Sequence, residues 1–329
     1  MDPLSEICAS LHVQDAMYTR VEATAPWGLA APGERGVKFV LLVRGSCILT
    51  MPTLDAPVAL RGGDVFITLD DTPYEIYDEP SSVLLDCAEV MAAMVDNTIV
   101  IGGNGAPSTF ISGVFKLDTA YAAPLLSVLP SFLWLPAGED RSSAFEAILG
   151  MLARETSRRA IGFESMIGRL FEILFIHAVR AYCEQQQAQV TGWLAVVADP
   201  NLGNAARAMH DDLGKDWTLE ALARIAGMSR TAFAARFKEK AGKTALDYLT
   251  YWRMFKAAKL IQQGTRSLAQ IATDVGYQSE AAFNRMFARE IGITPGRFRK
   301  SPELAARGGL RNPWSSPRSN GDPGSTITG

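Results

Sequence analysis

The chain has few of the residues that build disulfide frameworks or metal sites. Its 329 residues include 4 cysteines and 3 histidines. Cys8, Cys47, Cys87 and Cys183 lie far apart, and none forms a Cys-x-x-Cys pair. This spacing is typical of reduced thiols in a cytosol and argues against a disulfide-stabilised secreted domain.

Long apolar runs and enzyme fingerprints are also missing. No stretch approaches the roughly 18 consecutive apolar residues of a membrane span, and the start, MDPLSEICAS, lacks the basic and apolar segments of a secretion signal. We therefore expect a cytoplasmic protein without a membrane partner. The chain contains no nucleophile elbow, phosphate-binding loop or dinucleotide fingerprint, which favours binding over catalysis.

Positive charge is scarce overall but is concentrated in one region. The formal net charge is −3. Residues 201–300 hold 17 Lys and Arg against 9 Asp and Glu, a balance of +8, whereas residues 1–200 hold 12 against 24, a balance of −12. A basic module attached to an acidic body is the electrostatic footprint of a DNA-binding domain joined to another domain.

The basic region contains one pattern twice. Residues 219–248 read LEALARIAGMSRTAFAARFKEKAGKTALDY, and residues 268–298 read LAQIATDVGYQSEAAFNRMFAREIGITPGRF. The matching positions are Leu219 and Leu268, Leu222 and Ile271, Ala223 and Ala272, Gly227 and Gly276, Phe233 and Phe283, Phe237 and Phe287, Gly242 and Gly292, Thr244 and Thr294, and Tyr248 and Phe298. Each copy predicts a short helix, a glycine-containing turn and a second helix. This is the helix-turn-helix plan, whose second helix enters a DNA major groove.

Local signals within the copies predict where the helices begin and end. Gly227 supplies the left-handed conformation that ends the first helix, and Ser229 caps the next. In the second copy Ser267 and Gln270 form a capping-box pair, and Ser279 is the expected cap of the second long helix. Two plain helical hairpins would carry the same local signals, but two copies in register favour a DNA reader.

The remaining chain is predicted to begin with strands and to continue with helices. Residues 37–115 read as short strands with turns, including one at Gly45, which is typical of a sandwich or small barrel. Residues 142–159, 163–187, 202–212 and 245–261 carry helical periodicity. The tail from Arg307 is rich in Gly, Ser, Pro and Asn and is predicted to be disordered.

Three residues outside the repeats invite a functional interpretation. Asp64 follows two glycines and is expected to be a turn carboxylate, with a ligand contact as the alternative. Cys87 lies in the apolar segment VLLDCAEV, predicted to be a strand, and is expected to be a small buried side chain, with redox sensing as the alternative. His177 lies within an apolar helical segment and is expected in a core or an interface.

Taken together, these segments resemble the AraC family of bacterial transcription regulators. LARIAGMSRTAFAARFKEKAG, YLTYWRMFKAAKLI and IATDVGYQSEAAFNRMFAREIGITPGRFR carry the resemblance of the C-terminal part. WGL at residues 27–29, VKFVLLVRGSCIL, LRGGDVFITL and RLFEILFIHAVRAY resemble the cupin-type sensory domain of one branch of that family. The resemblance reaches about residue 300.

The resemblance implies an α+β protein in four parts. Residues 1–118 form a cupin-like β-barrel sensory domain, and residues 119–200 form a helical linker and dimerisation segment. Residues 201–303 form an all-α DNA-binding domain with two helix-turn-helix motifs. Residues 304–329, beyond the resemblance, are expected from their composition to be a disordered tail. The implied partners are double-stranded DNA, a second copy of the chain and a small-molecule effector; contact with RNA polymerase is left open.

The resemblance also places the recognition helices at about residues 230–240 and 280–290. The side chains expected to face DNA are Arg230, Thr231, Ala234, Ala235, Lys238, Glu280, Ala281, Asn284, Arg285 and Arg289. Arg285 is expected to read a guanine edge and Asn284 an adenine edge, whereas Thr231, Ala234 and Ala235 suit thymine methyl groups. Lys238, Lys240 and Lys243 are expected at phosphates, and Arg289 near the DNA backbone. The helix at 245–261, with Trp252 and Arg253, would hold the readers about one DNA turn apart, roughly 34 Å.

An enzyme is the competing class, because many cupins bind a catalytic metal. Such a site needs several histidines with a carboxylate, and no histidine falls within residues 37–80, where Lys38 and Tyr74 stand about where this branch often shows histidine. We therefore expect no metal, no cofactor and no enzymatic activity. The alternatives are an effector-independent DNA-bending dimer and a cupin enzyme fused to a DNA-binding domain.

Dimerisation is expected through the helix at about residues 163–187. Its apolar side chains cover a wider stripe than a surface helix needs to bury against its own domain, which leaves part of the stripe for a partner. The residues of this set are Phe163, Ile167, Leu170, Phe171, Leu174, Phe175 and Ala178.

Overall fold

The computed structural model describes residues 2–8, 14–33, 36–116, 119–138, 143–157, 160–185 and 190–300. These residues divide into two compact units. Of the described residues, the sheet unit comprises those within Leu4–Ala122 and Leu129–Val190, and the helical unit comprises Asp2, Pro3, Ala123–Val128 and Thr191–Lys300. The expected tail at 304–329 lies outside the described residues. Whether the four expected parts fold separately, with the boundaries given above, stays a prediction.

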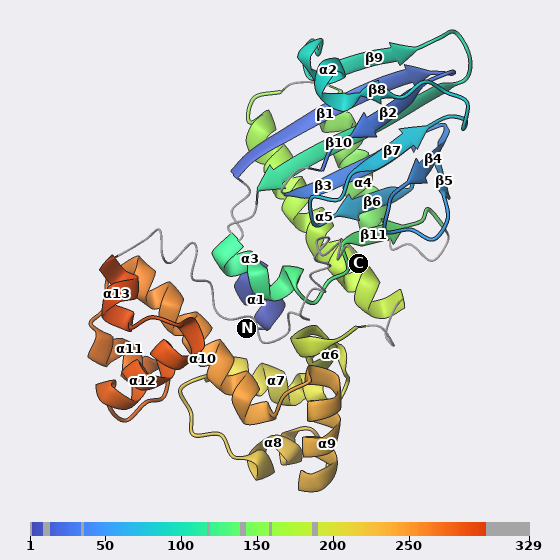
Figure 1. The fold of residues 1–329 in the computed structure, drawn as a ribbon. Helices are drawn as coiled ribbons and strands as arrows, with labels where there is room; N and C mark the ends of the chain where they lie inside the picture. Colours follow the sequence, from blue (N-terminus) through green and yellow to red (C-terminus); the bar gives the residue numbers. More distant parts are fainter. Residues whose placement is uncertain are drawn as a thin grey trace, which may run out of the picture. The chain divides into compact units, whose positions relative to one another are not determined.

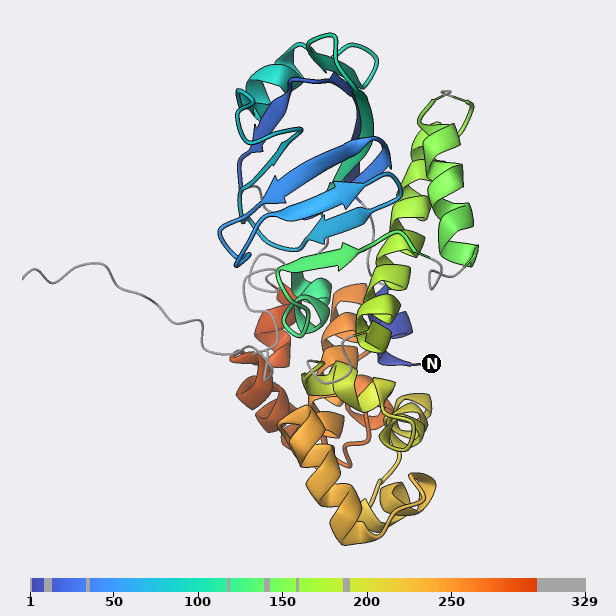
Figure 2. The same ribbon diagram turned by 90° about the vertical axis from the view of Figure 1, so that its right-hand side faces the viewer.

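Two facing sheets form the body of the sheet unit (Figures 1 and 2). The six-stranded sheet has the order β11-β6-β3-β10-β1-β9, and the five-stranded sheet has the order β5-β4-β7-β2-β8. The strands of the first are β1 (Gln14–Thr24), β3 (Val37–Arg44), β6 (Val65–Thr68), β9 (Thr98–Gly102), β10 (Pro107–Lys116) and β11 (Phe132–Leu135). Those of the second are β2 (Gly28–Ala31), β4 (Ser46–Thr50), β5 (Val58–Arg61), β7 (Tyr74–Tyr77) and β8 (Leu85–Asp86). The predicted sheet-rich domain is confirmed, although strand pairing does not close these described strands into one barrel.

Both faces of β3 are buried. Val40 and Leu42 point into the core between the sheets, and Lys38 shares their face because side chains alternate along a strand. On the opposite face Phe39 packs against Phe171 of α5 (Phe163–Gln185), with ring centroids 5.6 Å apart. A strand that is apolar on both faces explains the unbroken apolar run of VKFVLLV.

The close approach of α5 to the six-stranded sheet depends on a glycine in β10. A Cβ atom added at Gly113 would lie 2.3 Å from the ring of Phe171. Only glycine leaves room for that ring against the strand. Figure 2 shows α5 beside this sheet, together with α4 (Ser143–Glu155).

The burial of α5 corrects the expected dimerisation surface. All seven apolar side chains of the expected set, from Phe163 to Ala178, are buried within the chain itself. None of them remains for a partner. The large apolar side chains that are exposed here are Met166 and Ile173 on α5 and Met151 on α4. Dimerisation itself stays a prediction.

The segment around Cys87 was predicted as a strand, and this is wrong. Only Leu85 and Asp86 pair as strand β8, and Cys87–Ala92 forms helix α2. The Asp86 side chain accepts a hydrogen bond from the amide of Ala88, so a helix cap outweighs the strand preference of the preceding valine and leucines. Cys87 is consequently the half-buried first residue of a helix.

The helical unit consists mainly of helices. They are α6 (Gly192–Ala198), α7 (Leu202–Asp211), α8 (Leu219–Ile225), α9 (Arg230–Ala241), α10 (Ala245–Gln263), α11 (Leu268–Asp274), α12 (Glu280–Ile291) and α13 (Pro295–Lys300). The predicted helices at 202–212 and 245–261 are confirmed to within two residues. Helix α10 runs between the pair α8–α9 and the pair α11–α12 (Figure 1). None of the described helices is long and apolar enough to span a membrane.

The first half of the helical unit is centred on Trp252 of α10. This side chain has no exposed surface and packs edge-on against Trp193 of α6, with centroids 5.6 Å apart. The ring of His210 on α7 lies 4.9 Å away and hydrogen-bonds Tyr248 at 3.0 Å. Trp193 donates from Nε1 to the carbonyl of Pro124, a residue of α3 (Thr119–Leu126), at 2.7 Å. The chain before residue 201 therefore contributes to the same core.

Candidate nucleic-acid interface and ligand cavity

The caps and turns predicted for the repeats are confirmed. Ser229 accepts a hydrogen bond from the amide of Ala232, and Ser279 accepts one from the amide of Ala282, each at 3.2 Å. Ser267 and Gln270 exchange the two bonds of a capping box. Gly242 and Gly292 end the long helices α9 and α12 in the left-handed conformation, with φ of 69° and 88°. Both copies therefore present a helix of 12 residues whose start is set by a serine.

The turns of the two copies share a conformation but differ in packing. Gly227 and Gly276 both have positive φ, at 67° and 83°. A Cβ atom at Gly227 would meet no atom within 4 Å, whereas at Gly276 it would lie 2.4 Å from the carbonyl oxygen of Gly214. The second turn is thus pressed against the loop that follows α7.

Each long helix buries one face and exposes the opposite one. Phe233 and Phe237 of α9 and Phe283 and Phe287 of α12 have no exposed surface. Of the residues expected to face DNA, eight are exposed and two, Ala234 and Asn284, are half-buried. The exposed eight are Arg230, Thr231, Ala235, Lys238, Glu280, Ala281, Arg285 and Arg289. Their role at DNA stays a prediction.

The polar groups on these exposed faces differ in their freedom to reach DNA. No ion pair ties Arg285 or Lys238 to another described residue. Arg289 is paired with Glu290, with Nη2 and Oε1 2.8 Å apart. The amide oxygen of Asn284 is buried without a hydrogen bond, so this side chain must rotate before it can present both amide atoms to an adenine.

An ion pair that the sequence analysis missed, between a buried carboxylate and a partly exposed guanidinium, holds α9. Arg236 donates from Nε and Nη2 to one carboxylate oxygen of Asp199, at 3.0 and 2.7 Å. The other oxygen accepts from the amides of Asn201 and Leu202 at the start of α7. Burial alone would raise the pKa of the Asp199 carboxyl, but hydrogen bonds from the Leu202 amide and the Arg236 guanidinium outweigh it and lower the pKa. In the sequence, Asp199-Pro200 indicates only a turn. The ion pair was missed because Arg236 lies 37 residues further along the chain.

The side chain of Arg253, on α10, makes its contacts within the protein. Its guanidinium donates to the carbonyls of Leu213 and Lys215, at 2.7 and 2.8 Å. It also lies over the ring of Tyr277, with 5.9 Å to the centroid. Arg253 thereby connects α10, the loop after α7 and the turn of the second copy, which supports its expected role in holding the two readers.

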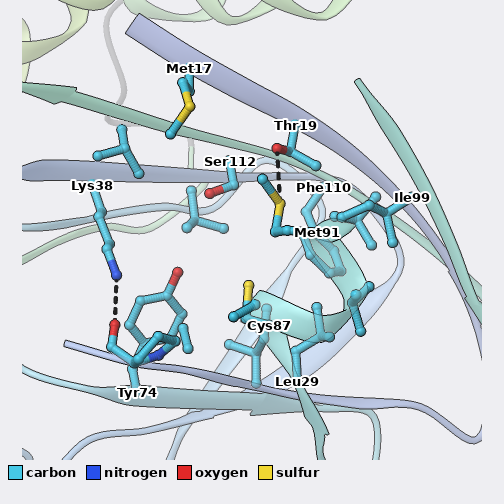
Figure 3. A pocket seen from close by; sticks show the side chains of 18 residues that line it. Met17, Thr19, Leu29, Lys38, Tyr74, Cys87, Met91, Ile99, Phe110 and Ser112 are labelled. Carbon is cyan, nitrogen blue, oxygen red and sulfur yellow. Dashed lines mark hydrogen bonds between the residues drawn. The ribbon is translucent and has the colours of Figure 1, made fainter. Parts of the chain in front are cut away.

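The sheet unit contains a cavity of about 170 Å³ between its two sheets. Most of its lining is apolar, with contributions from β1, β2, β3, β7, β9, β10 and α2. Lys38, Tyr74, Thr19 and Ser112 supply polar atoms (Figure 3). The residues expected to replace metal-binding histidines therefore line the same cavity, Lys38 from the six-stranded sheet and Tyr74 from the five-stranded sheet.

The structure also places the other residues singled out from the sequence. Asp64 is a turn carboxylate, as expected, because it accepts hydrogen bonds from the amides of Arg61 and Ala137 at 3.0 and 2.6 Å. His177 is half-buried against Phe145 of α4, and burial lowers its pKa. His12 lies outside the described residues. Within the described part of the chain, no three His, Cys, Asp or Glu side chains gather in a group that could hold a metal.

The thiols differ in their surroundings. Burial raises the pKa of Cys47 to about 12 and that of Cys183 to about 11, so both are poor thiolates. Cys87 instead lines the cavity, and its sulfur points into it (Figure 3).

Comparison with known proteins matches both halves of the chain. A cupin family profile matches residues 2–184, and a helix-turn-helix domain profile matches residues 222–301. A protein named as an AraC-like transcription regulator in Streptomyces lividans is 32% identical over 304 residues, which cover 92% of this chain and 100% of the relative. The HTH-type transcriptional regulator AlkR of Acinetobacter baylyi is 28% identical over 306 residues, covering 91% and 99%.

Among solved structures, ToxT from Vibrio cholerae is 10% identical, with 87% of this chain and 96% of that chain covered and a TM-score of 0.34. A TM-score this low does not establish a shared overall fold. The matches to the cupin profile and to the Streptomyces relative extend over most of the chain. The chain therefore belongs to the AraC-like family of transcription regulators, with a cupin-type domain ahead of a DNA-binding helix-turn-helix domain.

Proposed function

We propose that the protein regulates transcription by sequence-specific binding to the DNA major groove, with α9 and α12 as its two recognition helices. The observation that carries this proposal is the repeated division of each helix into a fully buried phenylalanine face and an exposed face with cations. Exposed arginine and lysine on a capped helix supply both base-edge and phosphate contacts.

The two recognition helices are suited to different tasks. The exposed face of α9 offers small side chains at Thr231 and Ala235, with Lys238 beside them. The face of α12 offers Arg285, which suits a bidentate contact with guanine. We expect the half-site bound by α12 to be the more strongly specified, whereas α9 adds methyl contacts and phosphate contacts.

Selection of bound duplexes from a random pool by the full-length protein tests this function. We expect one enriched sequence with two half-sites about one helical turn apart, and an affinity for it well above that for a scrambled duplex of the same composition. Equal affinity for both duplexes would contradict sequence-specific recognition.

We further propose that the cavity of the sheet unit takes a small-molecule effector. Its volume and largely apolar lining favour this function over an effector-independent DNA-bending dimer. Relatives that match over 91–92% of the chain are named as transcription regulators, which supports a role other than catalysis. An effector that binds the folded protein should raise its melting temperature.

A further inference from the structure

The cavity in the sheet unit has one cation in a largely apolar lining. Lys38 is only 5% exposed, and it is the only charged residue among the described residues that line the cavity. Strand alternation forces it inward, on the same face of β3 as Val40. Because burial of an ammonium group in apolar surroundings is costly, a lysine at this position indicates a function beyond packing.

The cavity has two chemically different ends. At one end Lys38 Nζ donates to the carbonyl of Pro32 at 2.8 Å and lies 5.6 Å from the centroid of the Tyr74 ring. Figure 3 shows Met91, Phe110 and Ile99 at the other end. A ligand that fills the cavity would therefore place a polar group beside Lys38 and an apolar body between the sheets.

The same alternation keeps the side chain of Glu75 out of this cavity. Glu75 lies between Tyr74 and Ile76 on β7, and it is exposed on the outer face of the strand while its neighbours are buried. The described lining includes no Asp or Glu. Lys38 is therefore the charged group of the described lining that can attract an anion.

The size of the cavity limits the apolar body. Its volume of about 170 Å³ is close to that of an apolar protein cavity known to hold benzene, roughly 150 Å³. We propose that the effector is a small apolar monocarboxylic acid, of the size of benzoate, whose carboxylate pairs with Lys38 and whose hydrocarbon part contacts Met91, Ile99 and Phe110. This inference rests on the proposed sensing function.

The test compares acids with neutral molecules of the same shape. Binding of benzoate, hexanoate, benzyl alcohol and 1-hexanol to the full-length protein is measured at neutral pH by calorimetry and by thermal shift. We expect at least one acid to bind about tenfold or more tightly than the matching alcohol, as a charge-assisted hydrogen bond would provide. Equal binding of acid and alcohol, or no binding of either acid at millimolar concentration, would overturn the inference.

Two variants locate the interaction. Lys38→Met removes the charge and keeps a side chain of similar length. It should abolish the preference for the acid while the alcohol still binds. Retained binding of the alcohol shows that the cavity is intact. Ala88 and Ala92 are both exposed on α2, but only Ala88 lines the cavity. Ala88→Phe should therefore weaken binding of acid and alcohol, and Ala92→Phe should not. An acid preference that survives Lys38→Met contradicts the assignment.

DNA binding by the same preparations separates this inference from the proposed function. If the selected duplex is bound but no acid is preferred, only the ligand class is wrong. If an acid is bound through Lys38 but no duplex is preferred, the ligand class stands and the regulatory function is at fault.

Discussion

Arg285 and Lys238 have the same charge and a similar exposure, but they are expected to contribute differently to DNA binding. Arginine presents a planar fork that matches the two acceptors of a guanine edge, whereas lysine is a compact charge suited to phosphates. Each lies on the exposed face of its helix, opposite a buried phenylalanine pair. The contrast allows base readout to be separated from positioning.

We expect Arg285→Ala to cost about 1–3 kcal/mol on the selected duplex and to relax the preference at one base pair. Lys238→Ala should weaken binding to all duplexes similarly and reduce the salt slope by about one unit. Affinities for a set of single-base variants, measured at several salt concentrations, distinguish these results. A uniform loss for Arg285→Ala would show that it does not contact a base.

The Asp199 carboxylate should make the free energy of unfolding depend on pH. Its pKa is lowered in the folded protein from the ordinary value of 3.8. The folded state therefore releases its proton more readily than the unfolded state, so this carboxylate stabilises the fold above about pH 4 and the contribution is lost as the pH falls further. Asp199→Asn should lower the unfolding midpoint at pH 7 more than at pH 3, as followed by tryptophan fluorescence. The exposed Asp55, changed to Asn, is the control and should show no such difference.

Helix α5 has two surfaces with separate roles. Its wide apolar stripe packs within the sheet unit, and glycine in β10 lets the helix lie close to the sheet. Met166 and Ile173 lie seven residues apart, about two turns, and so share one exposed face. A seven-residue spacing of apolar side chains is typical of helices that pair with a second helix.

We therefore expect the double variant Met166→Glu/Ile173→Glu to give a folded monomer, if the protein is a homodimer through this face. Light scattering at micromolar concentration reports the mass. Ser165→Glu, on another exposed face of the same helix, should leave the dimer intact. Leu170→Glu should instead unfold the sheet unit, because Leu170 is buried within the chain. A monomeric unmutated protein, both free and on DNA, would contradict the dimer.

The paired turns offer a matched test of packing. Gly227→Ala adds only the cost of a left-handed alanine, about 1–2 kcal/mol, because a Cβ atom there meets nothing within 4 Å. Gly276→Ala carries the same cost and also forces a Cβ atom to within 2.4 Å of the Gly214 carbonyl oxygen. We expect Gly276→Ala to lower the urea midpoint clearly more than Gly227→Ala. Equal decreases of the urea midpoint would show that the loop after α7 moves away from the added Cβ atom without loss of stability.

The molecule as a whole combines a basic reader with an acidic body. Residues 201–300 carry a balance of +8 within a chain of net charge −3. Acidic charge on the body opposes non-specific attachment to DNA, while the local excess of lysine and arginine provides phosphate contacts.

We expect the affinity of the full-length protein for any duplex to fall steeply with salt. With about six phosphate contacts the loss between roughly 50 and 200 mM salt is on the order of 10³. Selected and scrambled duplexes should show similar slopes, since phosphate contacts are common to both. The measurement is a salt series of binding isotherms. A flat salt response would contradict a phosphate-based interface.

The helical unit was predictable from sequence because its signals are local. Caps at Ser229 and Ser279, left-handed glycines and phenylalanines four residues apart act within one or two turns, and each was found where expected. Repetition of these signals then indicated a helix-turn-helix domain, which the family profile supports. The family resemblance then indicated that the strand-rich N-terminal part is a cupin-type domain.

Tertiary structure alone decided features that depend on distant partners. β1 pairs with β10 and β9, more than 70 residues away, so its place in the sheet does not follow from its neighbourhood in the sequence. The burial of both faces of β3, the Asp199–Arg236 pair and the position of Lys38 in the cavity wall likewise require segments far apart in the sequence. An apolar stripe shows that a side chain will be buried, but only the packed chain determines whether its own sheet or a second molecule covers it.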